Sequence, residues 1–187
     1  MKAVFLDKQG ALVDDFACNG QRRLSLRAGA GPALRLLARL DYRFFAVSDQ
    51  ETGDDGRIDE DIMARVAHRL GDLLFRERLT LEGFYYCPHD RNAPAPRNGL
   101  ECFCRKPQPG MLLKAAMEHE IDLRASWMIG ASLHDVEAGN RAGCRTVLID
   151  NGTEIEWRLG PRRVPTRIAP DLYAAARLIS IEGEERH

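Results

Sequence analysis

The stretch AVFLDKQGALVDD (residues 3–15) decides the fold, because its apolar run ends in a carboxylate at Asp7. A short apolar run is typical of a buried strand. In a parallel sheet, the residue that follows such a strand lies at the edge where ligands bind. Gln9 stands two residues later, where paired-carboxylate chemistry would need a second acid. The stretch therefore predicts a polar site at a strand end and leaves open whether that site is catalytically complete.

The rest of the chain alternates strand-like and helix-like segments. We expect strands at 44–48, 83–87, 126–130 and 144–150, and helices at 31–40, about 60–76, 109–120, 134–143 and about 171–181. This alternation predicts an α/β, Rossmann-like fold, a parallel sheet with helices on both faces. We expect a single domain over 1–187, because that length suffices for one core and no repeat or linker interrupts the pattern. The strand-end rule then brings Asp7, Ser48, Lys106 and the loop GASLHD (130–135) to one edge.

Composition excludes several classes of function. The net charge is −1, with 29% charged and 44% hydrophobic residues, which gives no reason to expect nucleic acid or an anionic membrane as a partner. The apolar stretch before Asp7 is too short for a signal peptide. Nothing approaches the roughly 20 apolar residues of a membrane span. We therefore expect a cytoplasmic protein.

The five cysteines are an odd number, and three of them lie close together with a histidine. The motifs are Cys87-x-His89 and Cys102-x-Cys104, which flank a polar insertion rich in Pro and Asn. Three thiolates and one imidazole suit tetrahedral Zn²⁺ and leave no open coordination position. The pattern predicts a structural zinc loop at 87–104 in a reducing compartment. Cys18 and Cys144 lie outside it, and we expect both to be buried apolar fillers.

Taken in order, these segments resemble a known family. Strand–Asp7, FFAVSD (44–49), C-x-H…C-x-C-R-K-P (87–107) and G-A-x-x-x-D (130–135) are similar to the haloacid dehalogenase (HAD) superfamily of phosphohydrolases. The chain is closest to the small zinc-containing branch that includes D-glycero-D-manno-heptose 1,7-bisphosphate 7-phosphatase and histidinol-phosphate phosphatase. The resemblance covers residues 1 to about 150. It implies a HAD fold with a minimal cap and a small phosphorylated sugar or polyol as substrate.

The resemblance also implies roles for individual residues. Asp7 would be the nucleophile, and it would hold Mg²⁺ together with Asp135. Ser48 would hydrogen-bond the phosphoryl group, and Lys106 would neutralise charge on Asp7 and the phosphate. Arg105 would contact a substrate phosphate.

Four departures from the family pattern fall on working positions. Gln9 replaces the acid–base aspartate, and an amide cannot relay a proton. Ala131 replaces a metal-binding aspartate, and a methyl group cannot ligate Mg²⁺. Asp49 brings a negative charge to a substrate-binding position where the branch usually has Asn. Asp55 stands where the branch commonly has a substrate-contacting Arg. Weak Mg²⁺ binding and impaired turnover are therefore expected.

Two hypotheses of different kinds remain open. One is a phosphatase for a small sugar phosphate with reduced activity, in which Asp49 could compensate for a lost carboxylate. The other is a catalytically silent homologue that binds a phosphorylated ligand or a protein partner. We interpret Asp14 and Asp15 as a turn or helix start, His134 as a helix-start residue and Trp127 as a packing residue.

Overall fold

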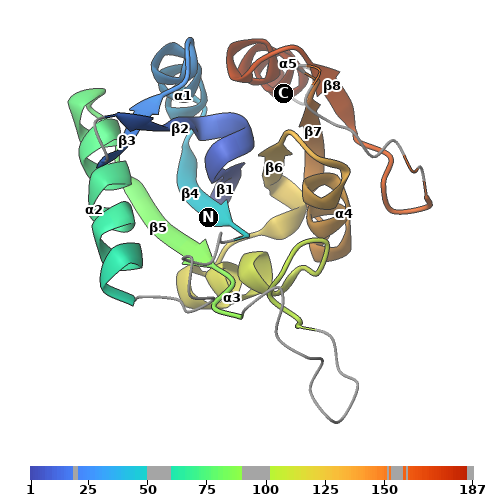
Figure 1. Cartoon of the computed structure of the whole chain (residues 1–187). Coiled ribbons are helices and arrows are strands. Elements are labelled where there is room, and N and C mark those ends of the chain that lie inside the picture. The colour runs from blue at the N-terminus through green and yellow to red at the C-terminus, as the bar shows by residue number, and fades with distance from the viewer. Residues whose placement is uncertain are drawn as a thin grey trace, which may run out of the picture.

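A six-stranded sheet forms the centre of the computed structural model, which describes residues 1–18, 21–49, 60–89, 102–150, 152, 158 and 160–184. Its strands are β1 (Lys2–Asp7), β4 (Tyr42–Ser48), β5 (Leu81–Tyr86), β6 (Trp127–Gly130), β7 (Arg145–Ile149) and β8 (Arg167–Ala169). They run in the order β5-β4-β1-β6-β7-β8, and every neighbouring pair is parallel (Figure 1). The predicted α/β fold with a parallel sheet is confirmed.

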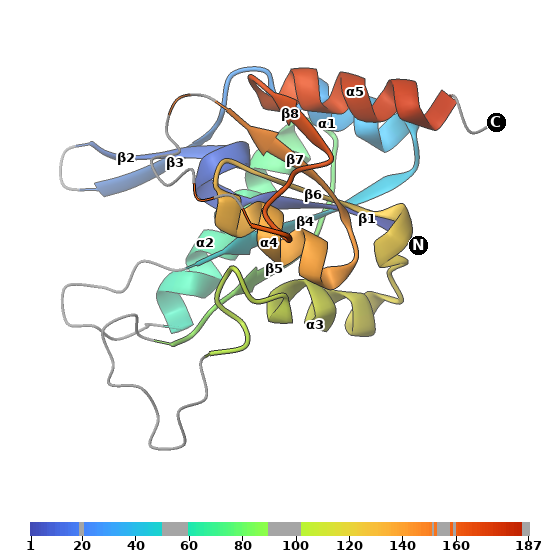
Figure 2. The ribbon, with the colours of Figure 1, turned by 90° about the vertical axis from the view of Figure 1, so that its right-hand side faces the viewer.

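Helices cover both faces of this sheet. They are α1 (Ala30–Arg39), α2 (Glu60–Arg76), α3 (Gly110–His119), α4 (Leu133–Ala142) and α5 (Leu172–Glu184), with a 3₁₀ turn at Leu123–Ala125. Figure 2 shows α1 and α5 above the sheet and α3 below it. Among the described helices, none combines the length and the apolar character needed to cross a membrane.

The strand that opens the chain is buried from both sides, which explains its unbroken apolar run. Val4 and Leu6 pack in one core with residues of α1, α2 and α5. Ala3 and Phe5 point to the other face and pack in a second core with residues of α3. Asp7 ends the run, and its carboxylate therefore emerges at the carboxyl-terminal edge of the sheet.

Several elements differ from the sequence-based expectation. A five-residue π-helix (Lys8–Leu12) follows β1, and a hairpin of β2 (Val13–Cys18) and β3 (Gln21–Leu26) comes next. This hairpin extends beyond the carboxyl-terminal edge of the main sheet (Figure 2). The interpretation of Asp14 and Asp15 as a turn or helix start is wrong, because both lie in β2, and the buried side chain of Asp15 forms an ion pair with Lys8.

Other expectations agree with the structure. Trp127 is fully buried, and Cys144 is buried in the second core, as predicted. The C-terminal helix extends three residues beyond the expected 181, to Glu184. The side chain of Cys18, the loop at 50–59 with Asp55, and most of the insertion between His89 and Cys102 lie outside the described residues.

Candidate active site

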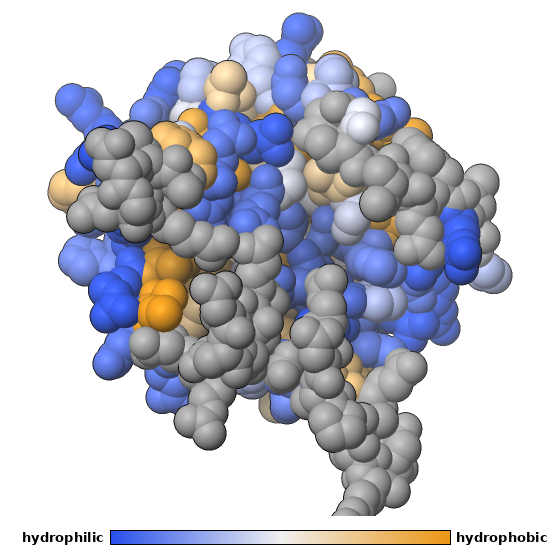
Figure 3. All heavy atoms as spheres, viewed as in Figure 1, coloured by the Kyte–Doolittle hydropathy of each residue, from blue (hydrophilic) through white to orange (hydrophobic). Residues whose placement is uncertain are grey.

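A cavity of about 330 Å³ opens at the carboxyl-terminal edge of the sheet. It is lined by Asp7, Gln9, Gly10, Ser48, Asp49, Lys106, Ala131, Ser132, His134 and Asp135. These residues come from the ends of β1, β4 and β6, from the start of α4 and from the turn before α3. Figure 3 views the molecule from this edge, where the atoms visible between the grey residues are largely hydrophilic. The structure thus brings together residues that the sequence places up to 128 positions apart.

The carboxylate of Asp7 is fixed by its own loop. Its Oδ2 accepts the backbone N–H of Gly10 at 2.5 Å and so caps the π-helix. A Cβ at position 10 would lie 2.6 Å from that same oxygen and 2.8 Å from the Cβ of Ala131. Glycine is needed there because the backbone approaches both side chains so closely.

Lys106 joins the two aspartates of the site. Its Nζ donates to Asp7 Oδ1 and to Asp135 Oδ1, each at 2.6 Å. Burial alone would lower the pKa of Lys106, but the charges of Asp135, Asp7 and Asp49 raise it well above its ordinary value. The side chain is therefore a permanent cation between two carboxylates.

Asp135 is held by the helix that carries it. Ser132 caps α4, and its backbone N–H and hydroxyl both donate to Asp135 Oδ2, while its hydroxyl accepts the Asp135 N–H. Gly130 makes room, because a Cβ there would lie 2.3 Å from Asp135 Oδ2. Burial raises the pKa of Asp135; Lys106 lowers it and Asp7 raises it again, which leaves it at about 6.

Ser48 and Asp49 supply the side of the cavity at the end of β4. Ser48 is only 5% exposed, and its hydroxyl has no hydrogen-bond partner within the described part of the chain. Asp49 Oδ1 accepts the backbone N–H of Lys106 at 2.9 Å. A hydroxyl without a protein partner that faces a cavity is available to a ligand.

The cavity has no carboxylate at positions 9 and 131, where the family pattern has aspartate. Gln9 reaches the cavity with an amide, and its backbone carbonyl accepts a hydrogen bond from Arg27 at 3.3 Å. Ala131 lines the cavity with a methyl group. Asp7 and Asp135 still offer carboxylate oxygens of the kind that Mg²⁺ prefers, so this donor set suits the ion but is smaller than the family pattern implies.

Arg105 is not among the residues that line the cavity. Its Nη2 donates to the backbone carbonyl of His89, and its Nη1 is buried without a partner in the described structure. The guanidinium thus lies against the cysteine-rich loop in this conformation. Its contact with a substrate phosphate stays a prediction.

Cys87, His89, Cys102 and Cys104 form a cluster that could hold a metal ion. Their four ligand atoms all lie within 4.8 Å of one another, and the shortest separation, between the sulfurs of Cys102 and Cys104, is 3.0 Å. Around tetrahedral Zn²⁺ with Zn–S bonds of about 2.3 Å, neighbouring sulfurs lie about 3.8 Å apart, so a small outward shift would complete the site. Burial raises the pKa of Cys87 and of Cys104. In Cys102, hydrogen bonds from those two thiols outweigh burial and lower the pKa. The donor set fits Zn²⁺.

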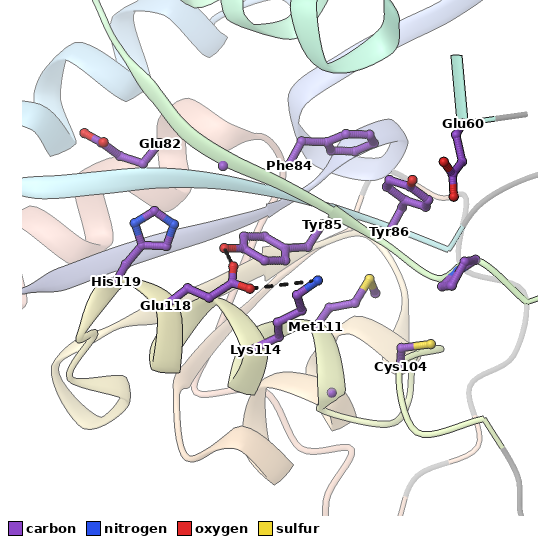
Figure 4. Close-up of a pocket in the computed structure, with 13 residues that line it drawn as sticks. Glu60, Glu82, Phe84, Tyr85, Tyr86, Cys104, Met111, Lys114, Glu118 and His119 are labelled. Carbon is purple, nitrogen blue, oxygen red and sulfur yellow. Dashed lines mark hydrogen bonds and ion pairs between the residues drawn. The ribbon is translucent and has the colours of Figure 1, made fainter. Parts of the chain in front are cut away.

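A larger hollow of about 620 Å³ lies along the edge strand β5, beside α3. Figure 4 shows Glu118 between Tyr85 and Lys114. The Tyr85 hydroxyl donates to Glu118 at 2.6 Å, and burial together with this bond raises the pKa of Tyr85 well above its ordinary range. Because its central polar groups are paired with one another, we assign the chemistry to the smaller cavity, where carboxylates, an ammonium and a free hydroxyl converge.

A parallel sheet with an aspartate after its central strand, a serine after the next strand, and a lysine and second aspartate beside them defines the HAD-like class of hydrolases. The comparisons agree: residues 103–175 match a family model described as HAD-hydrolase-like. The chain is 34% identical over 163 residues to the D-glycero-β-D-manno-heptose-1,7-bisphosphate 7-phosphatase of Photorhabdus laumondii, with 82% of each chain covered. It is 33% identical over 156 residues to the enzyme of that name from Pasteurella multocida, covering 82% of this chain and 84% of that one. The chain belongs to the D-glycero-D-manno-heptose-1,7-bisphosphate 7-phosphatase family.

A solved structure supports the fold. The D,D-heptose 1,7-bisphosphate phosphatase of B. bronchiseptica, complexed with magnesium and phosphate, superposes with a TM-score of 0.76 at 24% identity. The match covers 97% of this chain and 99% of that one.

Sequence reasoning gave no individual site role to three residues that line the cavity, although it placed the loop 130–135 at this edge. His134 is a helix-start residue, as expected, because α4 begins at Leu133, and it also lines the cavity. Gly10 and Ser132 hold the two aspartates through backbone and hydroxyl groups. The spacing Ser132-x-x-Asp135 is a capping-box signature and could have revealed one of them.

Proposed function

We propose that this protein is a slow phosphoric monoester hydrolase that uses Asp7 to accept the phosphoryl group of a small sugar phosphate. The observation that carries the proposal is the shared cavity of Asp7, Ser48 and Lys106. Heptose bisphosphate, the substrate in the names of the relatives, is the first compound to test.

Each residue has a role that its geometry supports. Asp7 Oδ attacks phosphorus to form an aspartyl phosphate, and the bond to the sugar oxygen breaks; water then hydrolyses the acyl phosphate. The free Ser48 hydroxyl donates to a phosphoryl oxygen. The Lys106 ammonium, already 2.6 Å from Asp7 Oδ1, offsets charge on the nucleophile and on the phosphoryl group. Asp7 and Asp135 would hold Mg²⁺, which would neutralise further phosphoryl charge.

The proposed rate is low for two physical reasons. The leaving sugar oxygen needs a proton and the attacking water must lose one. The amide of Gln9 can neither donate the first proton nor accept the second. Loss of general acid–base help costs about 10²- to 10⁴-fold. Ala131 removes a ligand from the Mg²⁺ site, which lowers both affinity for the ion and its stabilisation of charge.

The test restores the missing acids. The double substitution Gln9→Asp with Ala131→Asp should raise turnover of heptose 1,7-bisphosphate and of an aryl phosphate, with Mg²⁺ present, by at least about 10²-fold. Asp7→Asn should abolish the activity of both forms. The matched control is Gln9→Asn with Ala131→Asn, which has the same side-chain shapes without carboxylates and should not gain activity.

Fast turnover by the unmodified protein that the restored acids leave unchanged would contradict the proposed impairment. Activity that survives Asp7→Asn would remove Asp7 as the nucleophile. If the unmodified protein binds sugar phosphates but never turns them over, the silent-homologue hypothesis replaces the enzyme.

We also propose that the Cys87, His89, Cys102 and Cys104 cluster binds one structural Zn²⁺. A full set of four protein ligands leaves no position for an activated water. The ion would cross-link the loop next to Lys106.

A further inference from the structure

We propose that Asp49 makes the cavity select phosphate monoesters that carry an ammonium group, such as amino-sugar phosphates, over neutral sugar phosphates. The inference rests on the proposed function, because it names the substrate class of the same cavity.

Asp49 presents a free carboxylate oxygen to the cavity. Its Oδ1 accepts the Lys106 N–H at 2.9 Å, and within the described part of the chain its other oxygen has no hydrogen-bond partner. The Ser48 hydroxyl beside it is also without a partner, although the residue is 5% exposed. Two adjacent polar groups, one neutral and one anionic, are thus available to a ligand.

The charge of the cavity favours a cation on that ligand. Its described lining contains three carboxylates, on Asp7, Asp49 and Asp135, and Lys106 is its single ammonium. Lys106 already contacts Asp7 and Asp135. The third carboxylate acts on Lys106 only through its charge and forms no direct ion pair among the described residues, so an ammonium on the ligand would pair with it.

For a second phosphate, the described arginines near the cavity leave one unpartnered donor, the Nη1 of Arg105. The guanidinium of Arg105 donates to the His89 carbonyl. The guanidinium of Arg27 donates to the Gly10 carbonyl at 2.9 Å and lies 3.4 Å from Asp14. A bisphosphate would add negative charge beside Asp49, and like charges at such a distance repel.

The volume sets the size of the ligand. About 330 Å³ lies at the small end of the range for ligand sites, which suits one phosphate and one sugar ring. A cationic group on that ring would therefore lie close to Asp49, which lines the cavity.

The experiment compares three probes of one skeleton: D-glucosamine 6-phosphate, its N-acetyl derivative and D-glucose 6-phosphate. Hydrolysis is measured with Mg²⁺ at pH 7, and binding is measured by calorimetry on the Asp7→Asn variant, which leaves the probes intact. We expect D-glucosamine 6-phosphate to have a KM and a Kd lower by about tenfold than those of the other two. The N-acetyl compound keeps the nitrogen and removes the charge.

Asp49→Asn, alone for hydrolysis and in the Asp7→Asn background for binding, should erase this preference. It keeps an oxygen that can accept the Lys106 N–H, so the turn is preserved. The same variant should improve use of D-fructose 1,6-bisphosphate. Asp72→Asn is the control, because it changes the net charge equally on the exposed surface of α2 and should leave all ratios unchanged.

The outcomes separate the two proposals. Equal KM and Kd values for the three probes, or a preference that persists after Asp49→Asn, would overturn the role of Asp49 while hydrolysis still supports the enzyme. A preference in binding without any hydrolysis would support Asp49 and reject the enzyme. Absence of both binding and hydrolysis would overturn both.

Discussion

The ammonium of Lys106 balances two carboxylates that lie far from it in the chain. Asp7 precedes it by 99 residues, and Asp135 follows it by 29. Its side chain is 5% exposed, and that of Asp135 is 3% exposed, so solvent screens these charges little. Removing one partner of such a buried ion pair lowers the free energy of unfolding strongly, because it leaves a buried charge without compensation.

Lys106→Met should therefore lower the free energy of unfolding at pH 7 by about 3–5 kcal/mol. The loss should be smaller at pH 5, because without Lys106, whose charge lowers the pKa of Asp135, that pKa rises further; the carboxyl is then protonated at pH 5 and one stranded charge is removed. Urea unfolding at both pH values measures this difference. Lys114→Met is the matched control: its side chain is 66% exposed, and its loss should cost less than about 1 kcal/mol. An equal cost for the two substitutions would contradict the buried ion pair.

At the scale of elements, α4 is tied to the turn before β8 by a buried carboxylate. Glu137 Oε1 accepts from Arg141 at 2.6 and 2.9 Å, and Oε2 accepts from Arg163 at 2.7 Å. Burial tends to raise the pKa of Glu137, but the bonds from Arg163 and Arg141 outweigh it and lower the pKa. A lowered pKa in the folded state means that this group adds stability above its ordinary pKa of 4.5, and that the gain is lost as the pH falls through the folded value.

Glu137→Gln should reduce the free energy of unfolding at pH 7 by about 1.5–3 kcal/mol, since charge-assisted hydrogen bonds are lost. The deficit should shrink as the pH falls below 4.5, where Glu137 of the unfolded chain takes up a proton, and should vanish below the lower pKa of Glu137 in the folded protein. Denaturant titrations across pH 3 to 7 would show the two curves converging at acid pH. Glu82→Gln is the control, because Glu82 forms an ion pair with the half-exposed Arg43. Its curve of unfolding free energy against pH should stay parallel to that of the wild type. Curves for Glu137→Gln that stay parallel would show that the ion pairs add no stability.

Some helices and strands could be predicted from the sequence, and others could not. Buried strands and amphipathic helices follow from their apolar periodicity, and β1, β4, α1 and α2 lie within two residues of the expected ranges. The hairpin β2–β3 was missed because it lies outside the main sheet and Asp14 and Asp15 interrupt its apolar pattern. Phe16, on β2, is 47% exposed, so no core imposes a clear alternation there. Strand β8 has only three residues, two of them exposed, and carries no signal of its own.

For the site as a whole, the topology of a parallel sheet was sufficient to predict which residues lie close together. It was not sufficient to predict the contacts of their side chains. Strand ends meet at one edge by construction, which explains why Asp7 and Ser48 share a cavity. Lys106 reaches the same cavity from the turn before α3. The direction of the Arg105 guanidinium depends on a carbonyl 16 residues away. The place of His134 depends on where the capping box starts α4. Neither follows from periodicity.

The cysteine-rich loop connects the sheet to Lys106, so a metal ion bound by its four ligand residues would affect both the fold and the cavity. The Cys87 N–H donates to the Ser48 carbonyl at 3.2 Å, and Cys104 precedes Lys106 by two residues. A metal bridge between Cys87 and Cys102 would close a loop of about 15 residues, and a cross-link of that span stabilises by about 3 kcal/mol.

Removal of the metal with a zinc chelator should therefore lower Tm by about 6–12 °C and reduce phosphate-ester affinity, because the turn that carries Lys106 loses its anchor. Calorimetry measures the shift, and elemental analysis should find one zinc per chain before treatment. Cys102→Ser should reproduce both effects without chelator, whereas Cys144→Ala, at a buried cysteine outside the cluster, should keep one zinc per chain. Full zinc content in Cys102→Ser, or an unchanged Tm after chelation, would show that the four residues do not form a structural metal site.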